Sequence, residues 1–295
     1  MKNTLLFILL SLFFVPRLFA QDEAVTGEAK EKDKPVRFAW ESGLLIDNQT
    51  SYIPTVKTLE FVIQHKFGTI ENGHSDLWGI YATAANVRLG LNYVIANNLQ
   101  VGWGISKAKM YNDFNAKWTI FEQTRKNKIP VFVTVYANAA IDGRADENFG
   151  TEYQFSDRYA YFSELIIGRK VTDAISLQAG ISFSHANSVA EKFDHDRVGL
   201  HFNGRAKVSP QGSVIFNFDA PLQIDAISEQ RPEWGNHPKP NLSFGYEIST
   251  STHAFQIYMG NSEGILLQDI MMNNFNKIEK DNFAIGFTIT RLWSF

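Results

Sequence analysis

The residues best suited to metal or acid–base chemistry gather in one short part of the 295-residue chain. Asp194, His195 and Asp196 are consecutive, and His185 precedes them across a predicted loop. Carboxylate and imidazole groups can hold a divalent ion where they converge on one point. A charged, hydrated loop has the same composition without an ion. We expect this second arrangement, and we predict neither a metal site nor a cofactor.

Serine-based catalysis would require a serine, a histidine and an orienting acid at one point. Ser184 and His185 are adjacent, so in a strand their side chains leave opposite faces. The G-x-S-x-G motif of serine hydrolases does not occur. Gly102 and Gly104 form a G-x-G without the third glycine of a nucleotide site. The sequence therefore predicts no catalytic residues and no enzyme.

Composition excludes further classes of site. The chain has 0 Cys, which excludes disulfides, thiolate metal sites and lipidation of an N-terminal cysteine. Acidic side chains number 31 against 28 basic ones, so no basic excess is present to bind nucleic acid. Aromatic residues make up 14% of the chain, which favours β structure.

Charged side chains recur on one face of the predicted strands. From residue 57 onward, apolar and polar residues alternate with period two, in segments of about ten residues or more. Leu200 and Phe202 share one face of such a segment, whereas Arg197, His201 and Arg205 share the other. A soluble sandwich also alternates, so the connections between segments must discriminate between the two folds.

The connections sort by length. Twelve strands are predicted, at 57–67, 85–95, 98–107, 113–123, 128–140, 158–170, 174–185, 196–208, 212–221, 240–249, 252–261 and 282–295. Links after the even-numbered strands are short, and those after the odd-numbered strands are mostly longer. Short turns on one rim and long loops on the other are typical of bacterial membrane barrels. The fold class predicted is all-β, a transmembrane antiparallel β-barrel of about 12 strands with both termini periplasmic.

The alternation assigns apolar faces to lipid and polar faces to the lumen, because a charge facing lipid near the midplane costs about 2–4 kcal/mol. Twelve tilted strands give a backbone radius of roughly 12 Å, about half of which side chains fill. Such a lumen would admit small solutes at most, and a loop could fill it. The candidate lumen-facing residues are Glu60, Lys66, Arg88, Lys117, Glu164, Arg197, His201, Arg205, Asp219 and Glu247.

The N-terminal part divides into three predicted segments. Residues 1–20 have the pattern of a cleaved signal peptide. Residues 21–37 form a charged linker that we expect to be disordered, and 38–295 form the barrel. Residues 38–55 form either a short strand or a segment tucked into the barrel mouth. The apolar stretch 264–272 forms either a helix that caps or plugs one mouth or an extension of the neighbouring strand.

The C-terminal segment FAIGFTITRLWSF ends on an aromatic residue. Phe287, Trp293 and Phe295 make it resemble the strand by which the outer-membrane assembly machinery recognises its substrates. Further segments, LEFVIQHKFGTI and LWGIYATAANVRLGLNY among them, resemble a Bacteroidetes family of unknown function, the membrane bound beta barrel domain. The resemblance covers the chain after residue 38 and implies a barrel. It transfers no site residues, since the family carries no established activity.

These observations predict a passive channel for small solutes in the outer membrane of a Gram-negative, Bacteroidetes-like bacterium, with outer-membrane lipid and the assembly machinery as partners. The alternative is a non-conducting barrel with a structural role or one that binds a ligand or partner. Transport of an apolar ligand is a third interpretation, suggested by Leu266, Leu267, Ile270 and Met271 near one mouth.

Overall fold

The computed structural model describes residues 33–37, 39–230 and 234–295. The predicted signal peptide and the linker up to residue 32 lie outside these residues. At the end of the predicted linker, the Val36 N–H donates to the Gln123 carbonyl at 2.8 Å, and Pro35 bridges to Thr124. This part of the linker is therefore paired with the barrel.

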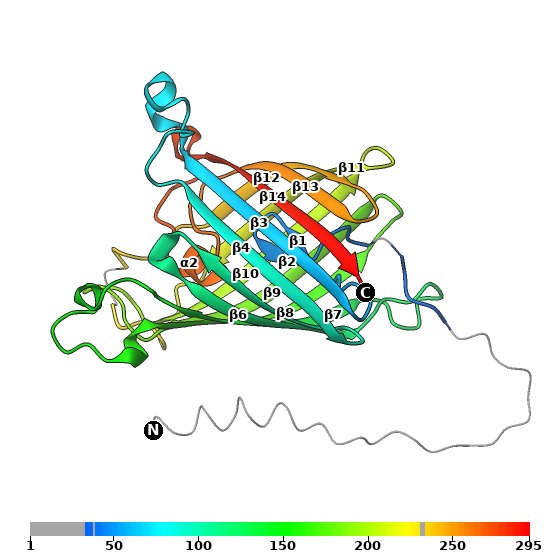
Figure 1. Ribbon diagram of the computed structural model, residues 1–295, viewed down its shortest axis with the longest axis horizontal. Coiled ribbons are helices and arrows are strands. Elements are labelled where there is room, and N and C mark those ends of the chain that lie inside the picture. Colours follow the sequence, from blue (N-terminus) through cyan, green and yellow to red (C-terminus); the bar gives the residue numbers. More distant parts are fainter. Residues whose placement is uncertain (1–32, 38, 231–233) are drawn as a thin grey trace, which may run out of the picture. The chain divides into compact units, whose positions relative to one another are not determined.

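Twelve antiparallel strands, β3 to β14, form a closed barrel (Figure 1). Closure comes from pairing of the first and last of them, with Thr58 opposite Ser294. The strands are β3 Thr58–Thr69, β4 Asn86–Ala96, β5 Leu99–Ser106, β6 Asn112–Phe121, β7 Phe132–Ile141, β8 Tyr159–Lys170, β9 Ile175–Ala186, β10 Asp196–Lys207, β11 Gly212–Pro221, β12 Asn241–Ser249, β13 His253–Gly260 and β14 Ala284–Ser294. Each corresponds to one predicted strand, and the prediction of a twelve-stranded barrel is confirmed.

One strand, β7, begins four residues after its predicted start, whereas the other strands begin within two residues of theirs. β7 begins at Phe132 rather than at 128, so the preceding link spans 122–131. Pro130 lies in this link, and proline has no backbone N–H to donate to a strand ladder. The pairing of β6 with β7 therefore starts after it.

Side chains alternate between the two surfaces of the barrel wall. β3, TLEFVIQHKFGT, alternates buried and partly buried residues along its whole length. The outward side chains include Leu89, Leu91 and Tyr93 of β4, which are 39–40% exposed. The inward side chains are mostly polar and buried. The register of each strand thus follows from the period of its residues, since a shift by one residue would exchange the two faces.

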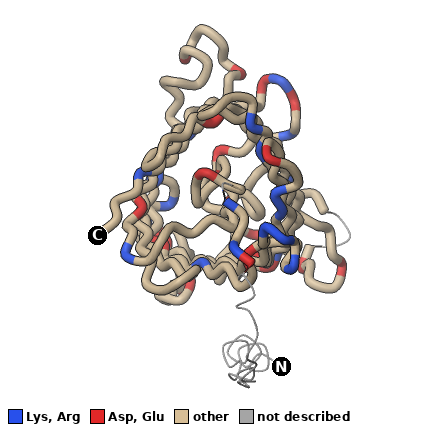
Figure 2. The backbone as a smooth tube through the Cα atoms, turned by 90° about the vertical axis from the view of Figure 1, so that its right-hand side faces the viewer, with Lys and Arg blue, Asp and Glu red and all other residues tan. Residues whose placement is uncertain are grey.

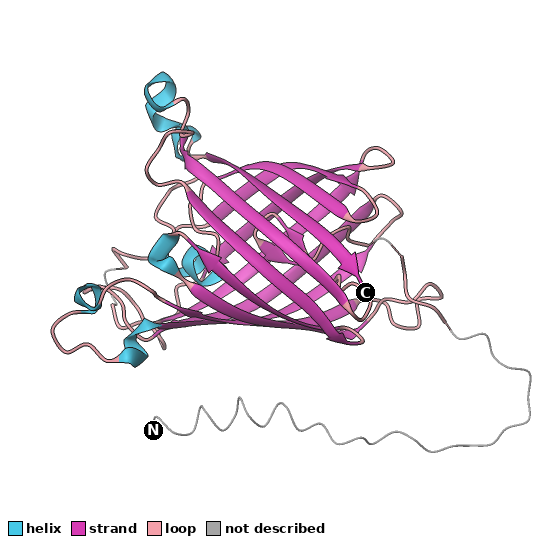
Figure 3. Cartoon of the chain, in the orientation of Figure 1, coloured by secondary structure: helices cyan, strands magenta, loops and turns pink. Residues whose placement is uncertain are grey.

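The two rims differ in their connections. The short-turn rim carries the links after β4, β6, β8, β10 and β12, together with the start of β3 and the end of β14. The long-loop rim carries the other links, and the helices gather there (Figure 3). They are η1 Ile70–Asp76, η2 Ala108–Met110, η3 Asp146–Phe149, η4 Phe155–Arg158, α2 Leu267–Asn273 and η5 Lys280–Asn282. Within the described ranges, every helix is too short or too polar to cross a membrane.

Chain segments occupy the interior of the barrel, as the view along it shows (Figure 2). From the short-turn rim, the chain before β3 forms a hairpin of β1 Leu44–Leu45 and β2 Asn48–Gln49, which we call the plug. The chain returns to the same rim, where the Lys57 N–H donates to the Val94 carbonyl at 3.0 Å. From the long-loop rim, α2 enters and is buried. Of the alternatives left open by the sequence, the described residues 39–55 contain a hairpin in the lumen, and the apolar stretch at 264–272 contains most of the helix α2.

Candidate functional site: the lumen and its plug

The plug is packed against the wall by apolar side chains. Leu45 and Ile46 are 1% and 0% exposed and cluster with Phe132 of β7, Ile215 of β11 and Tyr258 of β13. Burying an aliphatic side chain of this size contributes roughly 1.5–3 kcal/mol. The inner wall is therefore not polar throughout, and its apolar part coincides with the plug.

Polar wall residues satisfy the backbone of the plug, since two-residue strands leave most of their own N–H and C=O groups unpaired. Gln256 contributes both an acceptor and a donor, accepting from the Ile46 N–H at 2.7 Å and donating to the Leu44 carbonyl at 2.9 Å. Asn217 donates to the Leu45 carbonyl at 2.8 Å. Lys117 donates to the Gly43 carbonyl at 3.1 Å. Side chains of the wall thus provide the hydrogen bonds that the backbone of a neighbouring third strand would otherwise provide to the hairpin.

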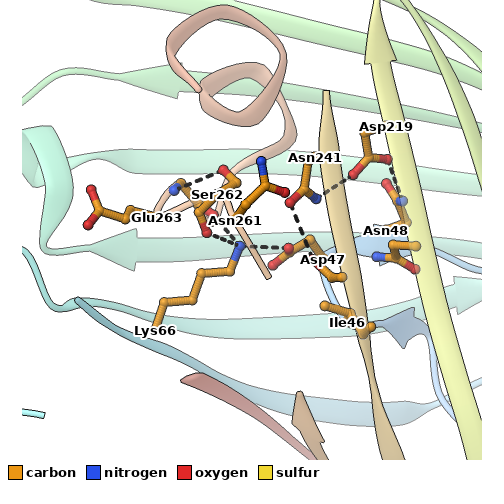
Figure 4. A network of polar contacts seen from close by, with 12 residues as sticks. Ile46, Asp47, Asn48, Lys66, Asp219, Asn241, Asn261, Ser262 and Glu263 are labelled. Carbon is orange, nitrogen blue, oxygen red and sulfur yellow. Dashed lines mark hydrogen bonds and ion pairs between the residues drawn. The ribbon is translucent and has the colours of Figure 1, made fainter. Parts of the chain in front are cut away.

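The turn of the plug carries an ion pair with the wall (Figure 4). Asp47 accepts a hydrogen bond from Lys66 of β3 at 2.7 Å, and both side chains are almost fully buried. The same ammonium donates to the carbonyls of Ser262 at 2.9 Å and Gly264 at 2.7 Å. These two residues begin the segment that leads to α2. Lys66 is therefore the point at which the two segments filling the lumen meet.

Asp219 of β11 holds the other side of the plug turn (Figure 4). Its two carboxylate oxygens accept from the side-chain amides of Asn48 and Asn241, each at 2.7 Å. His201 of β10 lies beside them, with Nδ1 2.8 Å from Asp219 Oδ1. Its Nε2 lies 2.7 Å from Ser182 Oγ.

Ser182, His201 and Asp219 thus have the connectivity of a hydrolase triad, which the sequence analysis did not find. All three are buried, Ser182 at 3% exposure, and Ser182 lines none of the cavities described below. A Cβ placed on Gly199 would lie 2.2 Å from Met271 Cε and 2.8 Å from Ser182 Oγ, so α2 covers this region. The arrangement fixes Asp219 for its contact with the plug, and α2 lies over it in this structure.

α2 fills the lumen from the opposite rim. Ile270 and Met271 are 1% and 0% exposed and pack with Tyr136 and Phe162 of the wall. The four apolar residues proposed for an apolar ligand, Leu266, Leu267, Ile270 and Met271, are all buried. These side chains contact the wall in this structure, and transport of an apolar ligand stays a prediction.

Polar contacts also fix the helix. Gln268 donates to Asn138 Oδ1 at 2.7 Å. Lys109 of η2 pairs with Asp269 at 2.9 Å. Burial disfavours the Lys109 ammonium, but the Asp269 carboxylate and the Tyr111 hydroxyl more than offset that cost, and the pKa of Lys109 is raised. The cation thus remains charged at the edge of the lumen, where it anchors the first turn of α2.

The predicted lumen residues on β3 to β6 are buried, and their hydrogen-bond partners include other polar residues of the wall and groups of the plug. Glu60 accepts from Asn92 at 3.0 Å and from Gln100 at 3.1 Å. Arg88 forms a bidentate contact with Asp113, at 2.8 and 2.7 Å. These side chains form a polar lining on which the plug rests, rather than free charges along an open path.

Two of those on β10 to β12 pair with each other, since Arg205 Nε lies 3.6 Å from Glu247 Oε1, and both have further partners. Arg205 donates to Ser213 Oγ at 2.7 Å and pairs with Glu41 at 3.2 Å, whereas Glu247 accepts from Gln256 at 2.8 Å. Glu164 of β8 is also buried, and its Oε2 has no hydrogen-bond partner among the described residues.

Arg197 lies near the long-loop rim. It pairs with Asp194 at 2.9 Å and donates to His237 Nδ1 at 2.9 Å. Burial and the charge of Arg197 lower the pKa of His237, so its ring is neutral and can accept this bond. Arg197 therefore fixes two loops at the rim instead of lining the middle of the lumen.

The candidate divalent-ion ligands do not converge. His185 lies 2.7 Å from Asp196, His195 lies 2.7 Å from Glu229, and Asp194 pairs with Arg197 as described. In the part of the chain that the structure describes, three or more His, Cys, Asp or Glu side chains gather nowhere in a way that could hold a metal ion.

Cavities lie at both mouths, and two of them border the segments that fill the lumen. The cavity at the long-loop rim has a volume of about 540 Å³ and is lined by Tyr111, Asp142 and Arg158 among others. The cavity at the short-turn rim has a volume of about 390 Å³, with Trp40 and Tyr52 in its lining. The plug and α2 lie between the two mouths. Of the two states that the sequence allows, an open lumen and one filled by a loop, this structure has the filled one.

The inward apolar residues that contact the plug and α2 are not among the predicted site residues. Ile215 lies between Ser213 and Asn217 on the inward face of β11, and all three are 0–1% exposed. An apolar residue within a polar inward face is the signal that could have identified the contact. This signal indicates that something covers Ile215, but it does not indicate which segment does so.

The C-terminal residues lie on the outer surface. Phe287 stacks on His65 at 5.1 Å between ring centroids, and Trp293 lies 6.4 Å from Phe61. Arg291 lies over the Trp293 ring at 4.8 Å, and Phe295 is 80% exposed. The proposed assembly signal thus presents accessible aromatic rings beside the seam of β14 and β3, and its recognition stays a prediction.

Comparison with known proteins identifies a family. The model described as membrane bound beta barrel domain (DUF5777) matches residues 40–293. Among solved structures, an outer membrane channel from Pseudomonas putida F1 is similar with a TM-score of 0.48 and 12% identity, over 82% of this chain and 97% of that one. The KdgM porin is similar with a TM-score of 0.45 and 9% identity, over 81% of this chain and 99% of its own. Among curated proteins, none matches.

Proposed function

This chain belongs to the family of membrane bound beta barrel domains, and from that premise we propose that it is an outer-membrane channel for small polar solutes, closed at rest by its plug. The short-turn rim and both ends of the barrel then face the periplasm. The observation that carries the proposal is the hairpin inside the barrel, with Leu45, Ile46 and Asn48 0–1% exposed.

The lining supports a water-filled path once the plug is displaced. The wall groups that hold the plug are amides and charges, among them Asn217, Gln256, Asp219 and Lys117. Each can exchange its bond to the plug for a bond to water, at a net cost of about 0.5–1.5 kcal/mol. Side chains of both signs along a hydrated wall suit small polar solutes.

Imperfect pairing supports displacement. Asp47 Oδ1, Asn48 Oδ1 and Glu60 Oε1 are buried and have no hydrogen-bond partner among the described residues. A buried acceptor left without a partner costs about 1–3 kcal/mol. This cost offsets part of the apolar packing of Leu45 and Ile46, so the docked and displaced states are closer in free energy than the buried area alone implies.

Single-channel recording in planar bilayers tests the proposal. The wild-type barrel is expected to be closed most of the time. A deletion variant that lacks both the plug, residues 43–50, and α2, residues 267–273, is expected to conduct steadily. Ile46→Asp places a charge at a fully buried plug position and is expected to raise the open fraction in the same direction. Ile278→Asp, at a loop position that is 44% exposed, serves as the matched control.

Two results would contradict the proposal. If the deletion variant folds and inserts but conducts no more than the wild type, the barrel is non-conducting and its role is structural or in binding. If the wild type conducts as steadily as the deletion variant, the plug does not close the path.

A further inference from the structure

The loop of residues 70–85, which joins β3 to β4 and which we call the lateral loop, leaves the barrel sideways. It carries η1 and stands out beyond the side of the barrel at the long-loop rim, both in the side view and in the view along the barrel (Figures 1 and 2). A segment that projects sideways at the level of the rim runs along the membrane surface rather than away from it.

The lateral loop exposes large apolar side chains. Leu77, Trp78 and Ile80 are 40%, 43% and 41% exposed, and Tyr81 is 77% exposed. The exposed apolar side chains on the outer face of the strands, such as Leu89 of β4, form what we call the apolar belt. Leu89 is 40% exposed. The apolar side chains of the loop are thus at least as exposed as Leu89 on the outer face of the barrel, although the loop backbone lies outside the barrel wall.

The conformation that presents these side chains is held firmly. Leu77 and Trp78 have φ of 54° and 53°, a left-handed conformation that costs free energy in residues other than glycine. The Trp78 N–H donates to the Gly73 carbonyl at 2.7 Å. At the base of the loop, a Cβ on Gly79 would lie 2.1 Å from the Gly68 carbonyl oxygen, so only glycine permits this close approach. The exposed apolar cluster is therefore a built feature.

We propose that the lateral loop is a membrane-surface anchor, whose Leu77, Trp78, Ile80 and Tyr81 side chains enter the lipid headgroup region beside the barrel. Continuity with the apolar belt identifies lipid as the occupant. Phe67 and Val87 lie on the outer, partly exposed face just before and after the loop. Trp and Tyr are the side chains that favour the interface between lipid and water.

The absence of cysteine from the chain permits a clean test with single spin labels. Labels are placed by Tyr81→Cys and Ile80→Cys in the lateral loop. Glu147→Cys, at an exposed position of η3 on the same rim, is the control for a loop in water. Ile257→Cys, 66% exposed on β13, is the reference for contact with lipid. The full-length barrel is reconstituted into vesicles of phosphatidylcholine and phosphatidylglycerol.

The measured quantity is the ratio of collisions with oxygen to collisions with a water-soluble nickel chelate. Labels at 80 and 81 are expected to give a ratio several-fold above that of Glu147→Cys and below that of Ile257→Cys, because the headgroup region lies between water and the hydrocarbon. A ratio equal to that of Glu147→Cys would show that the loop lies in water and would overturn the assignment. Dipolar broadening between labels on different molecules would assign the cluster to a second copy, which also overturns it.

Discussion

Lys66 illustrates how a single buried cation can serve two segments at once. Its ammonium contacts Asp47 in the plug and the carbonyls of Ser262 and Gly264 that precede α2. A buried ion pair contributes little net stability over a well-packed apolar pair, because desolvation offsets the attraction. Loss of one partner is costly, however, since the other charge stays buried. The contact therefore specifies where the two segments lie more than it stabilises them.

Lys66→Met is accordingly expected to weaken docking of the plug by about 3–5 kcal/mol, because Asp47 is left buried without a counter-charge. Adding Asp47→Asn to Lys66→Met should recover part of that loss. Hydrogen exchange of the Ile46 amide, which bonds to Gln256, measures the docked fraction. Simple additivity of the two substitutions would contradict the coupling. Lys277→Met, from an exposed pair with Glu279 at 3.7 Å, should leave exchange unchanged.

At the residue scale, period-two alternation indicates which face a side chain takes but not what it contacts. Glu60 and Asp219 were assigned to the lumen from parity, and both are buried there. Their partners could not be predicted in the same way. Asp219 bonds to Asn48, which is 171 positions away in the chain, and the register of the plug against the wall is set only when both have folded.

Among the elements, α2 allows a test of whether its packing against the wall keeps it docked in the lumen. Ile270 is 1% exposed and packs against Phe162, so Ile270→Ala should destabilise the docked helix by roughly 2–5 kcal/mol. Limited proteolysis within 261–283 should then be faster than in the wild type. Ile278→Ala, in the same loop but 44% exposed, should leave the cleavage rate within the effect of an ordinary surface substitution. Equal cleavage in the two variants would contradict the role of α2 in filling the lumen.

Elements with enough residues to show a period could be predicted, and those without could not. The alternating segment at 196–208 corresponds to β10, Asp196–Lys207. β1 and β2 contain two residues each, which is too short to show any period. Their backbone groups bond to Gln256 and Asn217 of the wall, which the local sequence does not show. For this reason the sequence alone could not decide whether 38–55 forms a short strand or a segment in the barrel mouth.

The whole barrel depends on an apolar outer surface at the depth of the hydrocarbon. Ile257 lies in the middle of β13 and is 66% exposed on that surface. Ile257→Arg should lower the free energy of unfolding in lipid vesicles by about 2–4 kcal/mol, measured by urea titration. Val208→Arg, 60% exposed in a link at the short-turn rim, should cost about 0–1 kcal/mol, since the penalty falls toward the interface. An equal cost at both positions would contradict the placement of the belt.

The route of the N-terminal chain has a mechanical consequence for the whole molecule. Val36 is tied to Gln123 and Lys57 to Val94, so both tethers of the hairpin lie at one mouth. The plug is therefore a hairpin inserted into the barrel from one mouth, and the chain does not pass through to the other mouth. A pulling force applied at that mouth can withdraw the plug while Val36 and Lys57 remain bonded to the wall. No knot has to be undone, and the seam between Thr58 and Ser294 stays sealed throughout.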